Sequence, residues 1–344
     1  MKISPLTTPQ TSFQVIIFHI CLYLIMFAFL YFSKLFFEDY GVMILNQIFI
    51  YTILAVSYNL INGVTGQLSL GPNGFIAIGA YITAIMLLSE ENKMDMYQLG
   101  ISDITLLFND SSLMVALLVS GFVSALAAII LAIPVFRVRG DYLAIVTLGF
   151  GLIIKIVIEQ ERTLTNGATG LNDIPEYANI YWCGFIALMA TILILQIIYS
   201  KYGRAMKAIR DDEDAALAMG IDTFKIKLYA LSTSAFLQGV GGGLLAALLT
   251  TIVAKDFGFE LTFKLLIIIV LGGLGSTTGA IIGTILVIGG GEWLRFLDDD
   301  LSFIGIDGSY PGLRMVIFSL ILLFVMIFAR EGILGKKEIW EFKK

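Results

Sequence analysis

The sequence predicts an all-α polytopic membrane protein with about ten transmembrane helices, on three observations. Hydrophobic residues fill 58% of the 344 positions and charged residues only 14%, whereas a soluble chain is about half apolar and a quarter charged. Apolar runs of the length that crosses a bilayer recur along the whole chain. Basic residues concentrate in alternate connecting segments. We therefore expect a single membrane domain over residues 1–344, without a separate soluble catalytic domain.

Ten apolar segments are candidate spans. They are residues 15–37, 42–60, 75–88, 113–135, 142–158, 180–199, 226–253, 263–274, 280–292 and 312–329. The first segment is too long for the apolar core of a signal peptide, so we expect it to be a retained helix.

The distribution of charge tests this count. With the N-terminus in the cytoplasm, the inner segments together with Lys227 carry 14 of the 22 Lys and Arg residues. The outer loops then carry mainly Asp and Glu. The positive-inside rule thus favours ten spans with both termini in the cytoplasm. Removing or adding one span would move either the 200–227 cluster or the 330–344 tail to the wrong side.

Several classes of function fit poorly. Composition excludes a disordered chain and a nucleic-acid-binding surface. A metal site and a catalytic site are not expected, because His19 is the single histidine and Cys21 and Cys183 lie in apolar runs. We place no carboxylate near the bilayer midplane, which disfavours an ion-coupled carrier. The phosphate-binding pattern G-x-x-x-x-G-K-[ST] is absent, so we expect no ATP or other cofactor on this chain.

Two glycine-rich segments, 62–74 and 271–279, interrupt the helical pattern. Backbone freed from a helix at membrane depth must be satisfied by protein or by a water-filled cavity, and broken helices of this kind line transport pathways. Tight packing through small residues is the alternative, which we favour for the four glycines between positions 239 and 243. The candidate pathway residues are Asn59, Gly66, Gln67, Ser69, Asn73, Ser276 and Thr277.

A short helix is predicted at residues 211–220, within the cytoplasmic loop 200–225. Asp211 or Asp212 suits the N-cap, and acidic residues follow in the first turn. Gly220 is a natural terminator. Two turns of helix are too short to be stable alone, so we expect this helix to dock on a cytoplasmic partner rather than rest on its own membrane domain.

Several motifs resemble those of a known family. Asp214–Gly220 resembles the E-A-A-x-x-x-G signature of membrane subunits of ATP-binding-cassette importers, with Asp in place of Glu. Five further runs resemble permease subunits of branched-chain amino acid importers, and the M-type permease in particular. They are NGVTGQLSLG at 62–71, RVRGDYLAIVTLGF at 137–150, GRAMKAIR at 203–210, VLGGLGS at 270–276 and REGILG at 330–335.

The resemblance implies a transport subunit of the bacterial plasma membrane that is not itself an enzyme. In that family, two related permeases form the core, two cytoplasmic ATPases bind ATP, and an extracytoplasmic binding protein delivers leucine, isoleucine or valine. Urea and amide importers share the architecture, so a urea or short-chain amide permease is the alternative, and an ion-coupled amino-acid transporter is less favoured. The implied ATPase-coupling residues are Asp212, Asp214, Ala215, Ala216, Met219 and Gly220.

Overall fold

The computed structural model describes residues 39–97, 100–136, 142–294, 312–328, 332–335 and 338. The segment predicted as the first span, 15–37, lies outside the described residues, as do His19 and Cys21. Within the described part of the chain the regular structure is helical, and extended pairing is confined to one isolated bridge between Leu171 and Ile252.

The helices follow one another along the chain with short connections. Their bounds are α2 Asp39–Asn59, η1 Leu60–Val64, α3 Pro72–Leu87, α4 Glu90–Met96, α5 Asp103–Leu106, α6 Leu113–Val135, α7 Tyr142–Gln160, α8 Arg162–Thr165, η2 Gly167–Thr169, α9 Ile180–Tyr199, α10 Lys201–Asp211, α11 Glu213–Ala218, α12 Thr223–Leu249, η3 Ala254–Phe257, α13 Phe259–Gly272, α14 Thr277–Thr284, η4 Ile285–Gly289, α15 Gly290–Trp293 and α16 Leu313–Phe328.

Five helical stretches of the described chain are long and apolar enough to cross a membrane: Asp39–Val64, Leu113–Val135, Leu143–Gln160, Ile180–Tyr199 and Thr223–Leu249. Two bent pairs raise the number to seven if each pair is one span. In the first pair α3 and α4 meet at 114°, and in the second α13 and the helix that begins at Thr277 meet at 119°. The fold is that of a polytopic membrane protein, and the count of ten spans remains a prediction.

Helix α12 is the centre of the bundle, and its glycines allow neighbouring backbones to touch. A Cβ atom at Gly242 would lie 2.2 Å from the carbonyl oxygen of Ile76 in α3. A Cβ atom at Gly79 would lie 2.1 Å from the carbonyl oxygen of Gly239. Small residues permit this close approach in membranes, where van der Waals contact drives helix association. The packing role favoured for the glycines between 239 and 243 is therefore observed.

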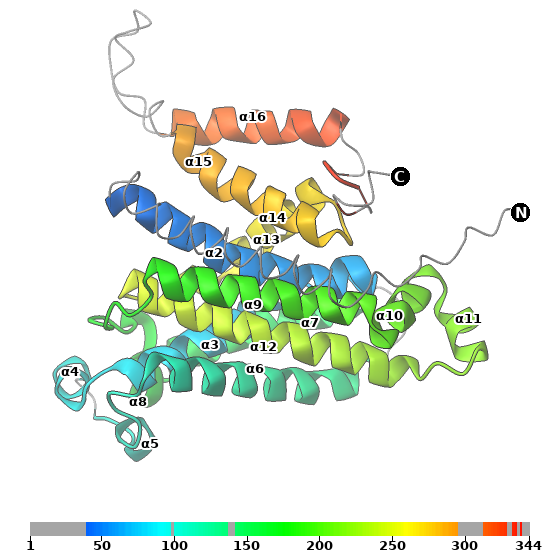
Figure 1. The fold of residues 1–344 in the computed structure, drawn as a ribbon. Helices are drawn as coiled ribbons and strands as arrows, with labels where there is room; N and C mark the ends of the chain where they lie inside the picture. Colours follow the sequence, from blue (N-terminus) through cyan, green and yellow to red (C-terminus); the bar gives the residue numbers. More distant parts are fainter. Residues whose placement is uncertain are drawn as a thin grey trace, which may run out of the picture.

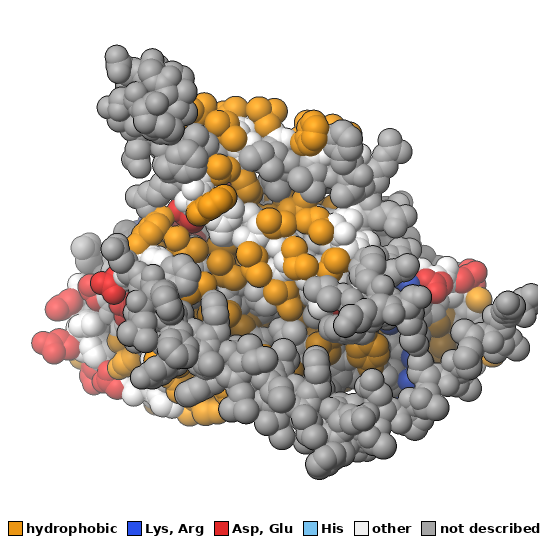
Figure 2. Space-filling model, turned by 45° about the horizontal axis from the view of Figure 1, so that its top comes forward, with side chains coloured by type: hydrophobic (Ala, Val, Ile, Leu, Met, Phe, Trp, Pro, Cys, Tyr) orange, Lys and Arg blue, Asp and Glu red, His pale blue; other side chains and the backbone are white. Residues whose placement is uncertain are grey.

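The two ends of the bundle differ in charge. Helices α10 and α11 lie at one end, and α4, α5 and α8 lie at the opposite end (Figure 1). Exposed Glu90, Glu91 and Asp95 belong to α4, whereas α10 carries Lys201 and Arg204 on its exposed surface. Figure 2 shows acidic side chains gathered at one end, basic and acidic side chains together at the other, and an apolar region between them. The positive-inside rule expects basic residues such as those of α10 in a cytoplasmic segment, and the orientation of the bundle stays a prediction.

Candidate coupling junction

The two glycine-rich segments lie against each other, although they are far apart in the sequence. A Cβ atom at Gly63, in η1, would lie 2.2 Å from the amide nitrogen of Gly275 and 2.1 Å from Oδ1 of Asn59. No side chain larger than hydrogen fits there without movement of the backbone. The end of the α2–η1 helix and the turn before α14 are thus in direct backbone contact.

Asn59 holds this contact with both ends of its amide. The amide nitrogen of Gly275 donates to Asn59 Oδ1 at 2.9 Å. Asn59 Nδ2 donates to the carbonyl oxygen of Ser276 at 3.0 Å. The side chain is buried, so these bonds replace the hydration that it would have in water. Asn59 therefore connects α2 to the start of α14.

Side chains also support the non-helical stretch between η1 and α3. The amide of Ser69 donates to Asn62 Oδ1 at 3.1 Å, and Tyr58 donates its hydroxyl to the carbonyl oxygen of Ser69 at 2.6 Å. The amide of Leu70 donates to Thr147 Oγ1 in α7 at 2.8 Å. Non-helical backbone is tolerated at membrane depth only where protein or water satisfies it, and here side chains of α2, η1 and α7 do so.

The predicted pathway residues fall into two groups. Gly66 is exposed and Gln67 is half-buried. The other five are buried: Asn59, Ser69, Asn73, Ser276 and Thr277. Two polar atoms of this buried group, Asn73 Oδ1 and Thr277 Oγ1, have no hydrogen-bond partner among the described residues. In this conformation Asn59 and Ser276 hold the two breaks together, and the part of the group in a pathway stays a prediction.

Arg210, in the last turn of α10, reaches both breaks. Its Nη1 donates to the carbonyl oxygen of Gly63 at 3.3 Å. Its aliphatic part lies against Gly66, where φ is +71° and a Cβ atom would lie 2.3 Å from Arg210 Cγ. A Cβ atom at Gly275 would lie 3.3 Å from the same Nη1. We define Asn59, Gly63, Gly66, Arg210 and the turn 273–276 as the coupling junction.

Helix α11 follows α10 directly and shares a residue with its end. Asp212 is the C-cap of α10 and the N-cap of α11, and its Oδ1 accepts from the amide of Ala215 at 2.9 Å. The predicted cap at 211 or 212 is thus confirmed at Asp212. Helix α11 is shorter than the predicted segment 211–220, and Gly220 follows it with φ +83°. Because there is no linker between the helices, a displacement of α11 moves α10.

The exposure of α11 shows which face is free for contact. Asp214, Ala215 and Gly220 are exposed, and Met219 is 83% exposed. Ala216 instead is buried against its own chain, so it is not available to a partner in this conformation. A 2.7 Å ion pair between Glu213 and Lys227 ties α11 to α12.

Asp222 caps the following helix by accepting from the amide of Lys225. The hydrogen bond from the Lys225 side chain lowers the pKa of the Asp222 carboxyl. Asp222 is therefore charged at neutral pH, which keeps this N-cap formed.

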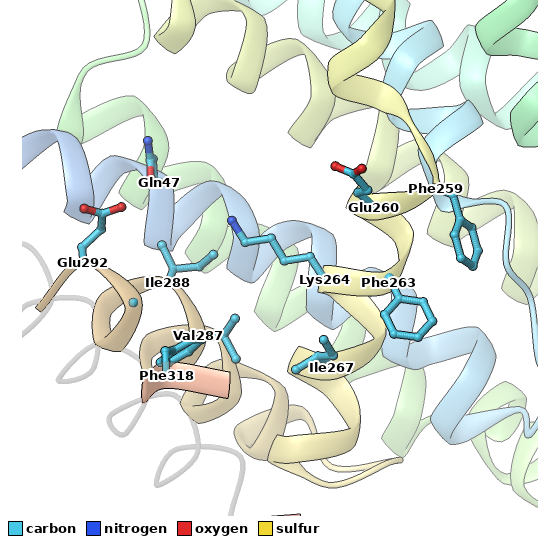
Figure 3. A pocket seen from close by; sticks show the side chains of 11 residues that line it. Gln47, Phe259, Glu260, Phe263, Lys264, Ile267, Val287, Ile288, Glu292 and Phe318 are labelled. Atoms are coloured by element: carbon cyan, nitrogen blue, oxygen red, sulfur yellow. The ribbon is translucent and has the colours of Figure 1, made fainter. Parts of the chain in front are cut away.

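A separate cavity of about 650 Å³ lies between α2, α13, the η4–α15 segment and α16 (Figure 3). Lys264 extends into it from α13, with Nζ 4.5 Å from the centroid of the Tyr51 ring. Glu260, Glu292 and Gln47 add polar groups to a lining that is otherwise apolar or glycine. The cavity shares no residue with the coupling junction and includes none of the predicted pathway residues.

A sequence profile described as "Branched-chain amino acid transport system / permease component" matches residues 40–329. The chain belongs to this family. The high-affinity branched-chain amino acid transport system permease protein LivM of Salmonella typhimurium is 32% identical over 280 residues, which cover 72% of this chain and 61% of that protein. LivM of Escherichia coli gives the same identity and coverage. This permease thus spans about three-fifths of the length of these LivM relatives.

A second type of relative also matches. The permease protein LivH of Salmonella typhimurium is 23% identical over 310 residues, covering 84% of this chain and 92% of that protein. No solved structure matches the chain. The permease family accounts for the motifs and for the apolar helical bundle. It does not explain the contacts of Arg210 and Glu338. Arg210 belongs to the motif at 203–210, whereas no local pattern in the sequence distinguishes Glu338.

Proposed function

We propose that this chain is the membrane-spanning permease subunit of an ATP-binding-cassette importer that carries leucine, isoleucine and valine into the cell. The observation that carries this proposal is the reach of Arg210 from the last turn of α10 to both glycine-rich breaks. A loop that contacts a partner outside the membrane and both breaks within the bundle can convert the movement of that partner into a change at the breaks.

In the proposed mechanism, two cytoplasmic ATPases hold α11 at its exposed face around Asp214, Ala215 and Met219. Closure of the ATPases on ATP displaces α11 and, through the shared residue Asp212, α10. Arg210 then moves relative to Gly63, and the contact between the breaks opens. Because packed helices have discrete arrangements rather than continuous ones, the result is a switch between two states of the bundle. ATP stays on the ATPases, and this chain needs no cofactor.

The substrate proposal rests on relatives and on the chemistry of the breaks. The LivM and LivH relatives are named as permeases for branched-chain amino acids. The side chains at the breaks are amides and hydroxyls without charge, which suits passage of a zwitterion that must leave again. We further propose a heterodimer with a LivH-like permease and delivery by an extracytoplasmic binding protein. We also propose cytoplasmic termini, which the basic residues of the 200–227 segment support.

Uptake by whole cells tests this function. Cells that lack the chain should lose most uptake of radiolabelled leucine and regain it with a plasmid copy. Excess isoleucine or valine should compete, and excess urea or acetamide should not. Competition by the amides instead would assign the chain to a urea or amide importer. Uptake that survives ATP depletion and stops with a proton ionophore would assign it to an ion-coupled carrier.

Replacing Gly220 with valine is expected to reduce the leucine carried per ATP by about fivefold or more. Gly220 has φ +83° and open space around it, so the substitution acts on backbone conformation and not through a clash. A β-branched residue disfavours this left-handed conformation, and the end of α11 should reorganise. Proteoliposomes containing the complete importer measure both rates.

The matched control is Gly220→Asn, because asparagine tolerates the left-handed region better than valine. It should retain most coupling. If the valine variant transports as efficiently per ATP as the asparagine variant, the conformation of α11 has no part in coupling.

A further inference from the structure

The C-terminal segment crosses the break between α13 and α14. The amide of Ile333 donates to the carbonyl oxygen of Leu271 at 2.9 Å, and the amide of Leu334 donates to that of Gly272 at 3.2 Å. These carbonyls belong to the last turn of α13, which has no intrahelical donors for them. The segment therefore caps the end of α13 from outside the helix.

Glycines allow the segment to lie directly on the break. A Cβ atom at Gly332 would lie 2.6 Å from the Cα atom of Gly273, and one at Gly273 would lie 2.3 Å from the carbonyl oxygen of Gly335. All three glycines have positive φ, a conformation that L side chains rarely adopt. The run REGILG, which the function has not so far explained, contains two of these glycines.

Glu338 closes the other side of the break at the start of α14. It is 5% exposed. Its Oε1 accepts from the amide of Thr277 at 2.8 Å. Its Oε2 accepts from the amide of Thr278 at 3.0 Å, from Thr278 Oγ1 at 2.6 Å and from Ser276 Oγ at 3.3 Å. A carboxylate at a helix N-terminus is stabilised by the helix dipole and by charge-assisted bonds.

The turn 273–276 is thus held from two directions. Asn59 holds it on the side of α2, and the Arg210 guanidinium lies beside Gly275 on the side of α10. Residues 332–335 and Glu338 hold it from the C-terminal side, and three residues separate Gly332 from Phe328, the last residue of α16. The Cα atoms of Phe328 and Gly332 are four residues apart in the chain, so they lie within about 14 Å of each other. The turn cannot move far from α16 while Glu338 stays bonded.

We propose that residues 332–335 and Glu338 are a latch on the α13–α14 break, and that Glu338 leaves its seat on Thr277 and Thr278 in each transport cycle. Glu338 is a positioning residue: it sets the resting place of the turn that Arg210 displaces. The inference rests on the proposed function, because it assigns a role to the tail within the same ATP-driven switch.

Hydrogen–deuterium exchange on the assembled importer tests whether the latch opens. In the wild-type protein, the amides of Thr277 and Thr278 should exchange slowly without nucleotide and faster during ATP turnover. Glu338→Gln removes the charge and presents an NH₂ group to donors, so exchange of these amides without nucleotide should rise by about tenfold. Glu176→Gln, at an exposed position in the outer loop, should change neither amide.

A second measurement is the leucine carried per ATP, which would not change if Glu338 were only a structural cap. Glu338→Gln should raise ATP hydrolysis in the absence of binding protein by about threefold and lower the leucine carried per ATP. Thr278→Val, which removes one hydroxyl donor and keeps the carboxylate, should lie between this variant and wild type. Assembly of each variant is checked by size-exclusion chromatography before the rates are compared.

Two outcomes would overturn the latch. If the amides of Thr277 and Thr278 exchange faster in Glu338→Gln but the leucine carried per ATP is unchanged, the carboxylate is only a static cap. Equal exchange with and without ATP turnover would mean that Glu338 never leaves its seat. A wild-type complex that carries no leucine while its ATPases turn over would count against the proposed substrate instead, and the exchange experiment would still decide the latch.

Discussion

Replacing Gly63 with alanine is expected to lower leucine uptake by at least about tenfold. The added methyl group would lie 2.2 Å from the Gly275 amide nitrogen and 2.1 Å from Asn59 Oδ1, so η1 and the turn before α14 must separate. Forcing extra atoms into a packed contact costs about 1–3 kcal/mol, and about 1.4 kcal/mol is a factor of ten in an equilibrium. The conformation in which the two breaks touch should therefore be strongly depopulated.

Gly149→Ala is the matched control for Gly63→Ala. Gly149 also lies inside a helix, α7, but nothing lies within 4 Å of the position its Cβ atom would take. Uptake should be near wild type. Both variants are compared at equal amounts in the membrane, measured by immunoblotting. Normal uptake in Gly63→Ala at wild-type abundance would show that contact between the breaks is not needed for transport.

Replacing Arg210 with leucine is expected to separate ATP hydrolysis from transport. The substitution leaves α10 helical, because leucine is a strong helix former, but it removes the Nη1 bond to the Gly63 carbonyl oxygen. ATPases that still hold α11 should then turn over without moving the breaks. We expect ATP hydrolysis within about twofold of wild type and leucine carried per ATP lower by about fivefold or more, a coupling loss of about 1 kcal/mol.

Arg204 on the same helix supplies the control. It is exposed, and its Nη1 donates to the local carbonyl oxygen of Tyr199 at 3.4 Å, a bond within its own region of the chain. Arg204→Leu should keep both rates, which shows that the loss at position 210 reflects the junction and not the charge of α10. Equal transport per ATP in the two variants would remove Arg210 from the coupling route.

The sequence predicted the long helices well because their apolar runs are uninterrupted. The segments 113–135 and 180–199 agree with the bounds of α6 and α9. The N-cap of α11 was also predictable, because Asp212 acts on an amide three residues away. In contrast, α10 was treated as part of a loop. It is a helix whose buried residues Met206 and Ile209 face the bundle. Because most of its 11 residues are polar, its apolar face is a weak signal in the sequence.

The junction itself could not be predicted, for a physical reason. Each glycine-rich break was visible as a loss of helical pattern, but the contact of Gly63 with Gly275 joins segments more than 200 residues apart. Nothing in local spacing encodes such a pair. In the sequence, Arg210 is one of several basic residues of the 200–225 loop, and Glu338 is one acid in a charged tail. The fold places Arg210 at the carbonyl oxygen of Gly63 and Glu338 at the N-terminus of α14.

The claim on which the mechanism depends is that α11 is held by a separate ATPase, and site-specific photo-cross-linking tests it most directly. Met219 and Trp293 are 83% and 84% exposed, and each is replaced in turn by a photoreactive phenylalanine derivative in the assembled importer. Irradiation should join position 219 to an ATPase subunit, with a yield that changes when ATP is added, and should not join position 293 to it. An intact complex in which position 219 gives no ATPase adduct, or reacts with the extracytoplasmic binding protein, would contradict the account.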